Sequence, residues 1–159
     1  MSFQQIRAKI ETKFAAELSV QIVYDNAQET PPNAPYARLI ISYNDVTEPV
    51  LCFDGQAIEN IRGNIQLSIY SPRGQGMGPL EDYATEGMVA MNTMYDKNAA
   101  AQVKCGQISG PEPVLSGDNP YALVTLSCPF TAQVRIPPVP PEEPEELFTN
   151  EVLLTNPLL

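Results

Sequence analysis

The chain has 159 residues and carries 9 basic against 19 acidic residues, for a net charge of −10. This length fits one domain with a core of its own. The acidic balance argues against a surface that grips nucleic acid through its phosphates, and the lack of any histidine removes the commonest general base and the commonest metal ligand. We therefore expect no enzyme, no cofactor and no metal site.

The three cysteines, Cys52, Cys105 and Cys128, are an odd number with no C-x-x-C spacing. They predict neither a zinc site nor a complete disulfide framework, and Cys128 reads as a small core residue. No run approaches the ~20 apolar residues of a membrane span, and the first residues lack the apolar centre of a signal peptide. We expect a soluble protein that is made and assembled inside a cell and has no membrane partner.

The first predicted elements are a helix and a short strand. Ser2 with Gln5 three residues later is typical of a capping box. Apolar residues then follow at helical spacing over residues 3–17, namely Phe3, Ile6, Ile10 and Phe14. A strand is expected over residues 20–24. The loop of residues 25–35 holds three prolines and is long for a turn between neighbouring strands, so Pro31 and Pro32 are candidate contact residues.

The pattern in the centre of the chain predicts strands. Residues 36–43 are rich in branched and aromatic side chains, and residues 46–53 either extend or pair with that strand. In residues 56–72 apolar and polar side chains alternate with a period of two from Ile61 onward, as in a sheet with one buried face. The phase slips between Ile58 and Ile61, which predicts a bulge at Glu59 or Asn60.

A second helix is predicted over residues 80–95. Pro79 at the first helical position and acidic residues in the first turn indicate the helix start. Met88, Met91 and Met94 form a stripe at helical spacing, together with Leu80, Tyr83, Ala84 and Tyr95. Core packing is the favoured reading of this stripe over an exposed methionine-rich binding surface.

Two further strands complete the predicted domain. Residues 102–108 form a weak strand, residues 109–120 a turn, and residues 121–136 a long alternating strand in which Pro129 sits at a bulge or an edge. The fold class is therefore α+β: an antiparallel β-sheet covered on one face by two helices, in the order α-β-β-β-α-β-β, with an extended C-terminal arm.

The domain is expected to span residues 1–136 and the Pro-rich acidic arm residues 137–159. The arm holds five of the 19 acidic residues and no basic one, which leaves 14 against 9, or −5, for the body. Its start favours an extended, polyproline-like segment. A solvated tail is one reading. The other is an arm that lies on a neighbouring subunit or partner through its apolar end, with Leu147, Phe148, Leu153 and Leu154 as contact residues.

Two segments have features of a chemical site. The glycine loop of residues 74–78 follows a strand and precedes a helix, but its spacing fits neither a dinucleotide fingerprint nor a P-loop. Glu81, Asp82 and Glu86 are close enough on the second helix for a carboxylate pair, yet a solvated helix face explains them better. No serine lies in a G-x-S-x-G elbow.

The central stretch resembles the tail terminator, or minor tail, protein family of long-tailed bacteriophages. The residues that carry the resemblance are the strand NIRGNIQLSIYSP (residues 60–72), the loop of residues 72–76 and the helix of residues 80–95. The opening helix followed by VQIVYDN and the order of elements over residues 1–136 are also similar to the family. The arm lies outside the common pattern, so its role is not carried over.

The resemblance implies a virion protein, assembled in the host cytoplasm, that forms a homo-oligomeric, hexameric ring on the last ring of the tail tube. Its partners would be itself, the tail-tube protein and a head-completion or neck protein, while DNA crosses the lumen without specific binding. An acidic lumen would let phosphates slide past. The loop residues Arg73, Gly74 and Gly76 are then candidate subunit contacts. The family implies no catalytic residues.

Other readings remain open at this point. The second interpretation is another head-tail connector or a tail-tube-like subunit. A tube subunit would stack into open-ended polymers. A small enzyme that uses carboxylates alone is a third reading, and an adaptor acting through its C-terminal arm is a fourth.

Overall fold

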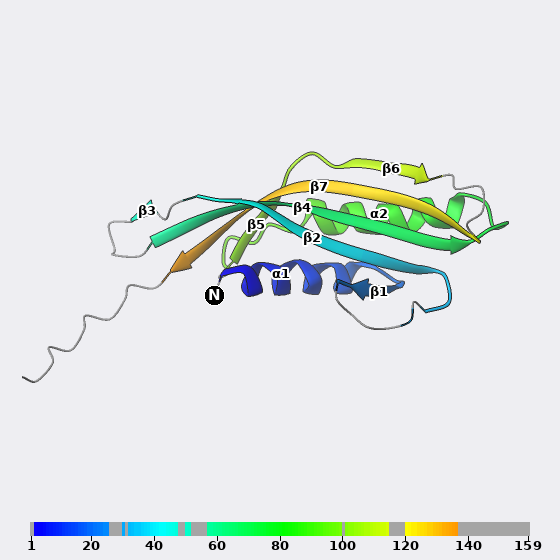
Figure 1. Ribbon diagram of the computed structural model, residues 1–159, viewed down its shortest axis with the longest axis horizontal. Coiled ribbons are helices and arrows are strands. Elements are labelled where there is room, and N and C mark those ends of the chain that lie inside the picture. The colour runs from blue at the N-terminus through cyan, green and yellow to red at the C-terminus, as the bar shows by residue number, and fades with distance from the viewer. Residues whose placement is uncertain are drawn as a thin grey trace, which may run out of the picture.

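The computed structural model describes residues 2–25, 30, 32–47, 50–51, 57–99, 101–114 and 120–136. The elements are α1 (Ser2–Glu17), β1 (Gln21–Tyr24), β2 (Tyr36–Val46), β3 (Val50–Leu51), β4 (Ala57–Pro72), α2 (Gly78–Asn92), β5 (Ala101–Cys105), β6 (Ser109–Val114) and β7 (Tyr121–Ile136). They form one sheet in the order β1-β2-β4-β7-β5, with β3 beside β4 and β6 beside β7 (Figure 1). The α+β class is confirmed.

Strands β4 and β7 are the spine of the sheet. They are antiparallel and pair without a break from Ala57 opposite Ile136 to Pro72 opposite Tyr121. Sixteen residues of strand extend over about 50 Å. The loop that follows Pro72 and the last residue of β7 therefore lie at opposite ends of the sheet (Figure 1).

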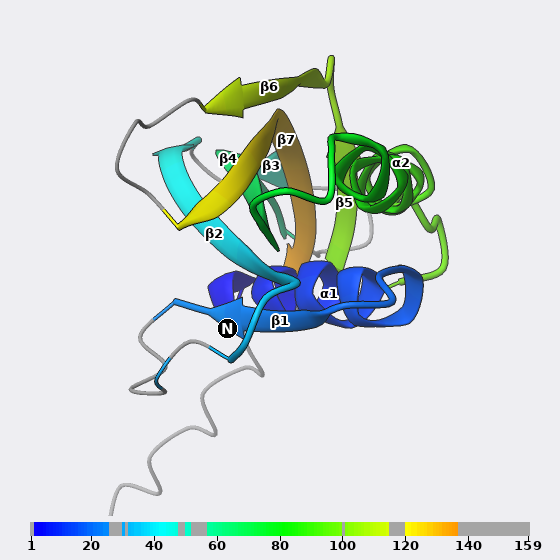
Figure 2. The same cartoon turned by 90° about the vertical axis from the view of Figure 1, so that its right-hand side faces the viewer.

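Both helices lie on one face of the curled sheet, which we call the inner face (Figure 2). The alternation predicted from the sequence decides which side chains point there. The fully buried residues of this face and of the helices include Ile6, Ile10, Phe14, Leu39, Ile61, Ile65, Leu67, Ile69, Leu80, Met91, Leu126 and Cys128. Each large apolar side chain contributes about 1.5–3 kcal/mol by leaving water.

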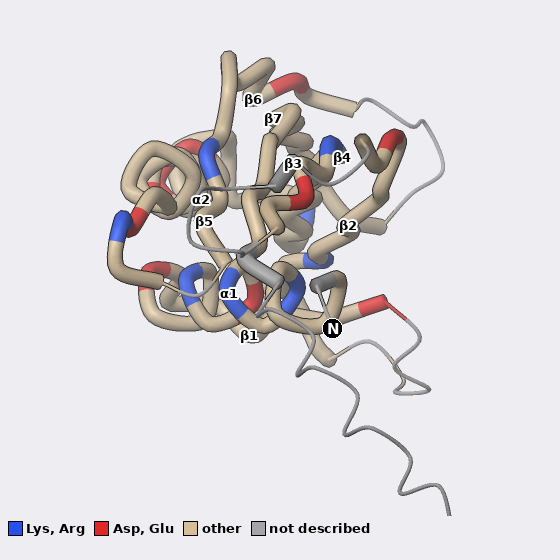
Figure 3. The backbone as a smooth tube through the Cα atoms, turned by 90° about the vertical axis from the view of Figure 1, so that its left-hand side faces the viewer, with Lys and Arg blue, Asp and Glu red and all other residues tan. Residues whose placement is uncertain are grey.

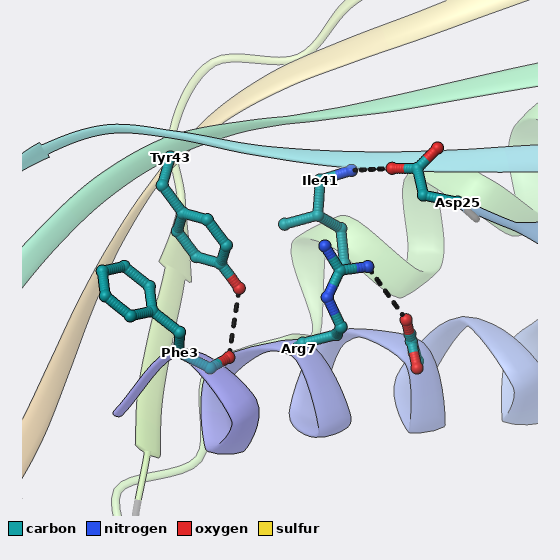
Figure 4. A network of polar contacts seen from close by, with 6 residues as sticks. Phe3, Arg7, Asp25, Ile41 and Tyr43 are labelled. Carbon is teal, nitrogen blue, oxygen red and sulfur yellow. Dashed lines mark hydrogen bonds and ion pairs between the residues drawn. The ribbon is translucent and has the colours of Figure 1, made fainter. Parts of the chain in front are cut away.

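An aromatic pair and a hydrogen bond join helix α1 to β2. The Tyr43 hydroxyl donates to the Phe3 carbonyl at 3.1 Å, and the two rings meet edge to face at 4.7 Å (Figure 4). Nearby, the Ile41 N–H donates to the Asp25 carboxylate at 3.4 Å. Burial raises the pKa of Tyr43, against the opposing effect of Arg7. The tyrosine is therefore a neutral donor at neutral pH.

The basic residues of α1, blue in Figure 3, are all engaged in ion pairs. Arg7 pairs with Glu11 at 3.2 Å and Lys13 with Glu17 at 3.0 Å, each one helical turn apart. Lys9 reaches Asp96 beyond the end of α2 at 3.6 Å. The hydrogen bond from the Asn98 N–H lowers the pKa of Asp96 below its usual value, and the positive charge of Lys9 lowers it further. These cations therefore stabilise the body and leave little charge for a ligand.

The sheet departs from the prediction at its first strand, because β1 pairs with β2 in parallel. A chain that joins two parallel neighbours must first travel back along the strand, so the connection has to be long. This explains the length of the loop of residues 25–35. The predicted all-antiparallel pairing is thus wrong at this edge and right for the other strand pairs.

The predicted bulge is also misplaced. The pairing of β4 with β7 runs through Glu59 and Asn60 without a shift. The irregularity lies in β2, where Tyr43 pairs with Gly63 and Asp45 with Arg62, so Asn44 is the extra residue. The apolar phase changes near Ile58 because β4 there runs on past the fully buried part of the sheet, where residues 57–60 are all half-buried.

One strand was missed. Strand β6 lies within the segment predicted as a turn and pairs with the first half of β7, while β5 pairs with the second half. Pro129 lies where β5 ends and β6 has not begun, and its carbonyl accepts from Gly106 N at 2.7 Å. The prediction of a bulge or an edge strand for Pro129 is wrong. The residue lies in a middle strand, at a position between β5 and β6 where no partner needs an N–H donor.

The remaining elements follow the prediction with small shifts. Helix α1 begins one residue earlier than expected, and α2 begins at Gly78 and ends at Asn92. Met91 and Met94 are buried and Met88 is half-buried, so the methionine stripe is a core feature, whereas Tyr95 is 56% exposed. The side chain of Ser2 and the expected turn at Asp54 lie outside the described residues. No helix in the described part of the chain is long and apolar enough to cross a membrane.

Candidate functional site

The loop between β4 and α2 is an exposed surface feature at one end of the sheet. Arg73, Gly74 and Gly76 are all exposed. Gly74 and Gly76 have φ of +92° and +77°, in the left-handed region that favours glycine, and open space surrounds both. Because nothing lies within 4 Å of either Cβ position, this side of the loop is available to a neighbouring molecule.

Apolar atoms accompany this loop. A cavity of about 240 Å³ lies beside it, and Met77 and Val114, which are 38% and 46% exposed, form part of its lining. The Arg73 N–H donates to the Pro120 carbonyl at 3.4 Å and so fixes the loop against the start of β7. A fixed loop with exposed apolar neighbours is the kind of surface that suits a protein partner.

Three tyrosines form a cluster next to the loop. Tyr36 stacks on Tyr70 with ring centroids 4.7 Å apart and planes 11° from parallel, and Tyr121 meets both edge to face at 6.3 and 6.4 Å. They lie on the outer face of the sheet, opposite the helices, because Tyr70 follows the fully buried Ile69 in β4 and Tyr36 is its register partner. No local pattern in the sequence marks this cluster, because its members come from three strands.

Of the two predicted proline contacts, the structure describes only Pro32. Pro31 lies outside the described residues, as do Leu147, Phe148, Leu153 and Leu154. Pro32 is half-buried and precedes β2, whose first residue pairs with Tyr70 near the end of β4. The structure therefore brings Pro32 and Arg73 to the same end of the sheet.

A second surface feature was not predicted at all. Asp45, Arg62, Thr131 and Lys104 are register neighbours across β2, β4, β7 and β5 on the outer face, and all four are exposed. Two hollows, of about 490 and 470 Å³, meet here and share Lys104, Cys105 and Thr131. We call them together the cationic groove. No sequence motif marks it, since Arg62 and Lys104 are far apart in the chain.

The carboxylates considered as a catalytic pair do not point to a common site. Glu81 and Asp82 are exposed on α2. Glu86 accepts hydrogen bonds from the Ser19 N–H at 2.9 Å and from the Ser19 hydroxyl at 2.9 and 3.0 Å, and so links α2 to the end of α1. Glu86 is engaged in a structural contact. Within the described residues no group of three metal-ligating side chains comes together.

The two described cysteines lie in the same part of the sheet. Cys128 is buried, as predicted, and its thiol donates to the Pro129 carbonyl at 3.3 Å. A hydrogen bond with Cys128 and burial raise the pKa of the Cys105 thiol. Cys105 is therefore a neutral thiol at neutral pH and a poor nucleophile.

Comparison with known proteins supplies a fold but no family. No protein-family model and no curated protein matches the sequence. Several chains of solved structures match, and one of them does so with a TM-score of 0.57 and 22% sequence identity, over 83% of this chain and 96% of that chain. At this identity the likeness concerns the fold alone. Nearly the whole length of that protein therefore has a similar fold.

Proposed function

We propose that this protein is a structural subunit of a bacteriophage tail, which forms a ring that ends the tail tube and joins it to the head-completion or neck proteins. The observation that carries the proposal is the form of the segment that resembles the tail terminator family. It folds as one long strand, an exposed glycine loop and one covering helix, with the loop at the end of the sheet.

The two ends of the sheet also support a ring. The end that holds Arg73 exposes glycines and apolar side chains, whereas the other end holds Ala57 and the end of β7. A closed ring requires heterologous contacts, in which one surface of each copy meets a different surface of the next. A subunit with two unlike ends is suited to such contacts.

The charge of the chain agrees with a DNA channel. The body has a net charge of −5 even without the arm. A basic lining would bind the phosphates of a passing genome and slow it, whereas an acidic lining lets the DNA slide. In this proposal DNA is a transient passenger and not a bound partner.

Electron microscopy of the purified full-length chain tests the proposal. Closed rings of about six subunits, seen alone or on the end of tubes, are the expected result. Open-ended stacks would instead favour the tube-like alternative. Monomers that ignore the tube protein would contradict both readings.

A further inference from the structure

We propose that the glutamate-rich arm of one copy, residues 137–159, binds in the cationic groove on the outer face of a second copy. Glutamates of the arm would pair with Arg62 and Lys104. The proposal concerns only how two copies associate, so it holds whether or not the protein belongs to a phage tail.

The groove presents two cations at a fixed spacing. Arg62 in β4 and Lys104 in β5 both pair with Thr131 in β7, so the two residues stand on either side of the middle strand. Neighbouring strands lie about 4.8 Å apart, which places the two backbone positions about 9.6 Å from each other. The groove crosses the strands along this line.

These two cations have no ion pair within the described residues, unlike the basic residues of α1. Arg7, Lys9 and Lys13 each pair with a carboxylate at 3.0–3.6 Å. Asp45 is the acidic residue of the groove lining, and it is exposed next to Arg62 in the register without an ion pair among the described residues. The lining thus carries a net positive charge on an otherwise acidic body, and an anionic segment complements it.

The arm matches this spacing. Its sequence PPVPPEEPEE favours a polyproline helix, which advances about 3.1 Å per residue with three residues per turn. In that conformation Glu142 and Glu145 point to the same side about 9.3 Å apart, close to the separation of Arg62 and Lys104. Proline-rich segments also bind in grooves lined by aromatic side chains, and the 56%-exposed Tyr95 lines this one.

The stiffness of the prolines assigns the arm to a second copy. Thr131 lies five residues before Ile136, or about 17 Å back along β7. Glu142 lies six residues beyond Ile136, or about 19 Å onward along a polyproline helix. To reach its own groove, the arm would have to reverse direction within its prolines, which form a semi-rigid spacer.

A charge-exchange experiment with full-length chains tests the proposal. The groove variant carries Arg62→Glu and Lys104→Glu, and the arm variant carries Glu142→Lys and Glu145→Lys. Sedimentation equilibrium measures the association constant. We expect each variant alone to associate about tenfold or more weakly than the wild type. An equimolar mixture should recover wild-type association, because each groove then meets an arm of opposite charge.

Two controls separate this interaction from other effects. Arg38→Glu changes an exposed cation in β2 that does not line the groove, and it should associate like the wild type. Thermal unfolding of every variant should match the wild type closely, because Arg62 and Lys104 are exposed.

Three results would overturn the proposal. A wild-type chain that stays monomeric at every concentration has no arm contact between copies. If one chain carrying all four changes recovers wild-type behaviour while the mixture does not, the arm binds its own groove. If the groove variant keeps wild-type association and instead loses binding to a double-stranded DNA probe, the groove binds phosphates.

Discussion

Arg62 and Lys104 are register partners of the same residue, Thr131, although 41 residues separate them in the sequence. This relationship creates a pair of cations on the open face of an acidic protein. It also explains why the cationic groove lies across the strands rather than along them.

Gly63 is required by the backbone of β2 and by the aromatic ring next to it. A Cβ atom at this position would meet Phe130 Cζ at 2.5 Å and would also clash with the Ser42 carbonyl. Gly63→Ala should lower the free energy of unfolding by about 1–3 kcal/mol, because the strand or the ring must shift. Urea denaturation measures the change. Gln66→Ala, on the outer face of the same strand, is the control and should stay within about 0.5 kcal/mol of the wild type.

The Tyr43 hydroxyl should make stability depend on alkaline pH. Its folded pKa is raised, chiefly by burial. The resulting stability is complete below the unfolded pKa of about 10 and is lost as the pH rises through the folded value. Tyr43→Phe should cost about 1 kcal/mol at pH 7 through the lost hydrogen bond to Phe3.

Thermal melts of the wild type and Tyr43→Phe from pH 7 to 11 give the test. The difference between their melting temperatures should narrow above pH 10. A constant difference across this range would show that ionisation of Tyr43 does not contribute.

Ser19 and Glu86 should be energetically coupled, because Glu86 accepts both hydrogen bonds that Ser19 donates. In a double-mutant cycle with Ser19→Ala and Glu86→Gln, we expect a coupling of about 0.5–1 kcal/mol for this exposed contact. Because Ser19→Ala keeps the backbone N–H donor, additive effects would mean that the bond from the Ser19 hydroxyl to Glu86 is not formed in solution. Asp82→Asn, at an exposed neighbouring carboxylate, should show no coupling to Ser19.

The periodic segments could be predicted from the sequence. Alternation in β4 and β7 and helical spacing in α1 and α2 identify their buried faces, because burial on one face is what selects those patterns. Strand β6 could not be predicted, since SGPEPV contains a glycine and two prolines and is exposed throughout. It is a strand only because β7 offers a free edge, which is a long-range property of the fold.

The candidate surfaces were predictable in part, for a similar reason. Glycines between a strand and a helix mark a loop, so Gly74 and Gly76 could be found from local sequence. The tyrosine cluster and the cationic groove depend on the register of strands that are distant in the sequence. The extra residue Asn44 in β2 sets part of that register, and no local signal placed it there.

The exposed loop should matter for assembly before it matters for folding. Arg73→Glu reverses an exposed charge, and Gly76→Val places a branched residue at φ +77°, at a cost of about 1–3 kcal/mol. Both variants should remain folded by circular dichroism and yet form fewer rings in electron micrographs. Gln75→Ala in the same loop is the control. If both variants form normal rings, the loop is not a subunit contact.

The most direct test of the proposed ring is the length of tail tubes assembled with and without this protein. The cognate tube protein is polymerised in each condition, and tube lengths and tube ends are measured in electron micrographs. If the protein ends the tube, added protein stops elongation and appears as one ring of density at a tube end. Tubes that grow equally long in its presence, with no ring at either end, would show that the protein does not end the tube.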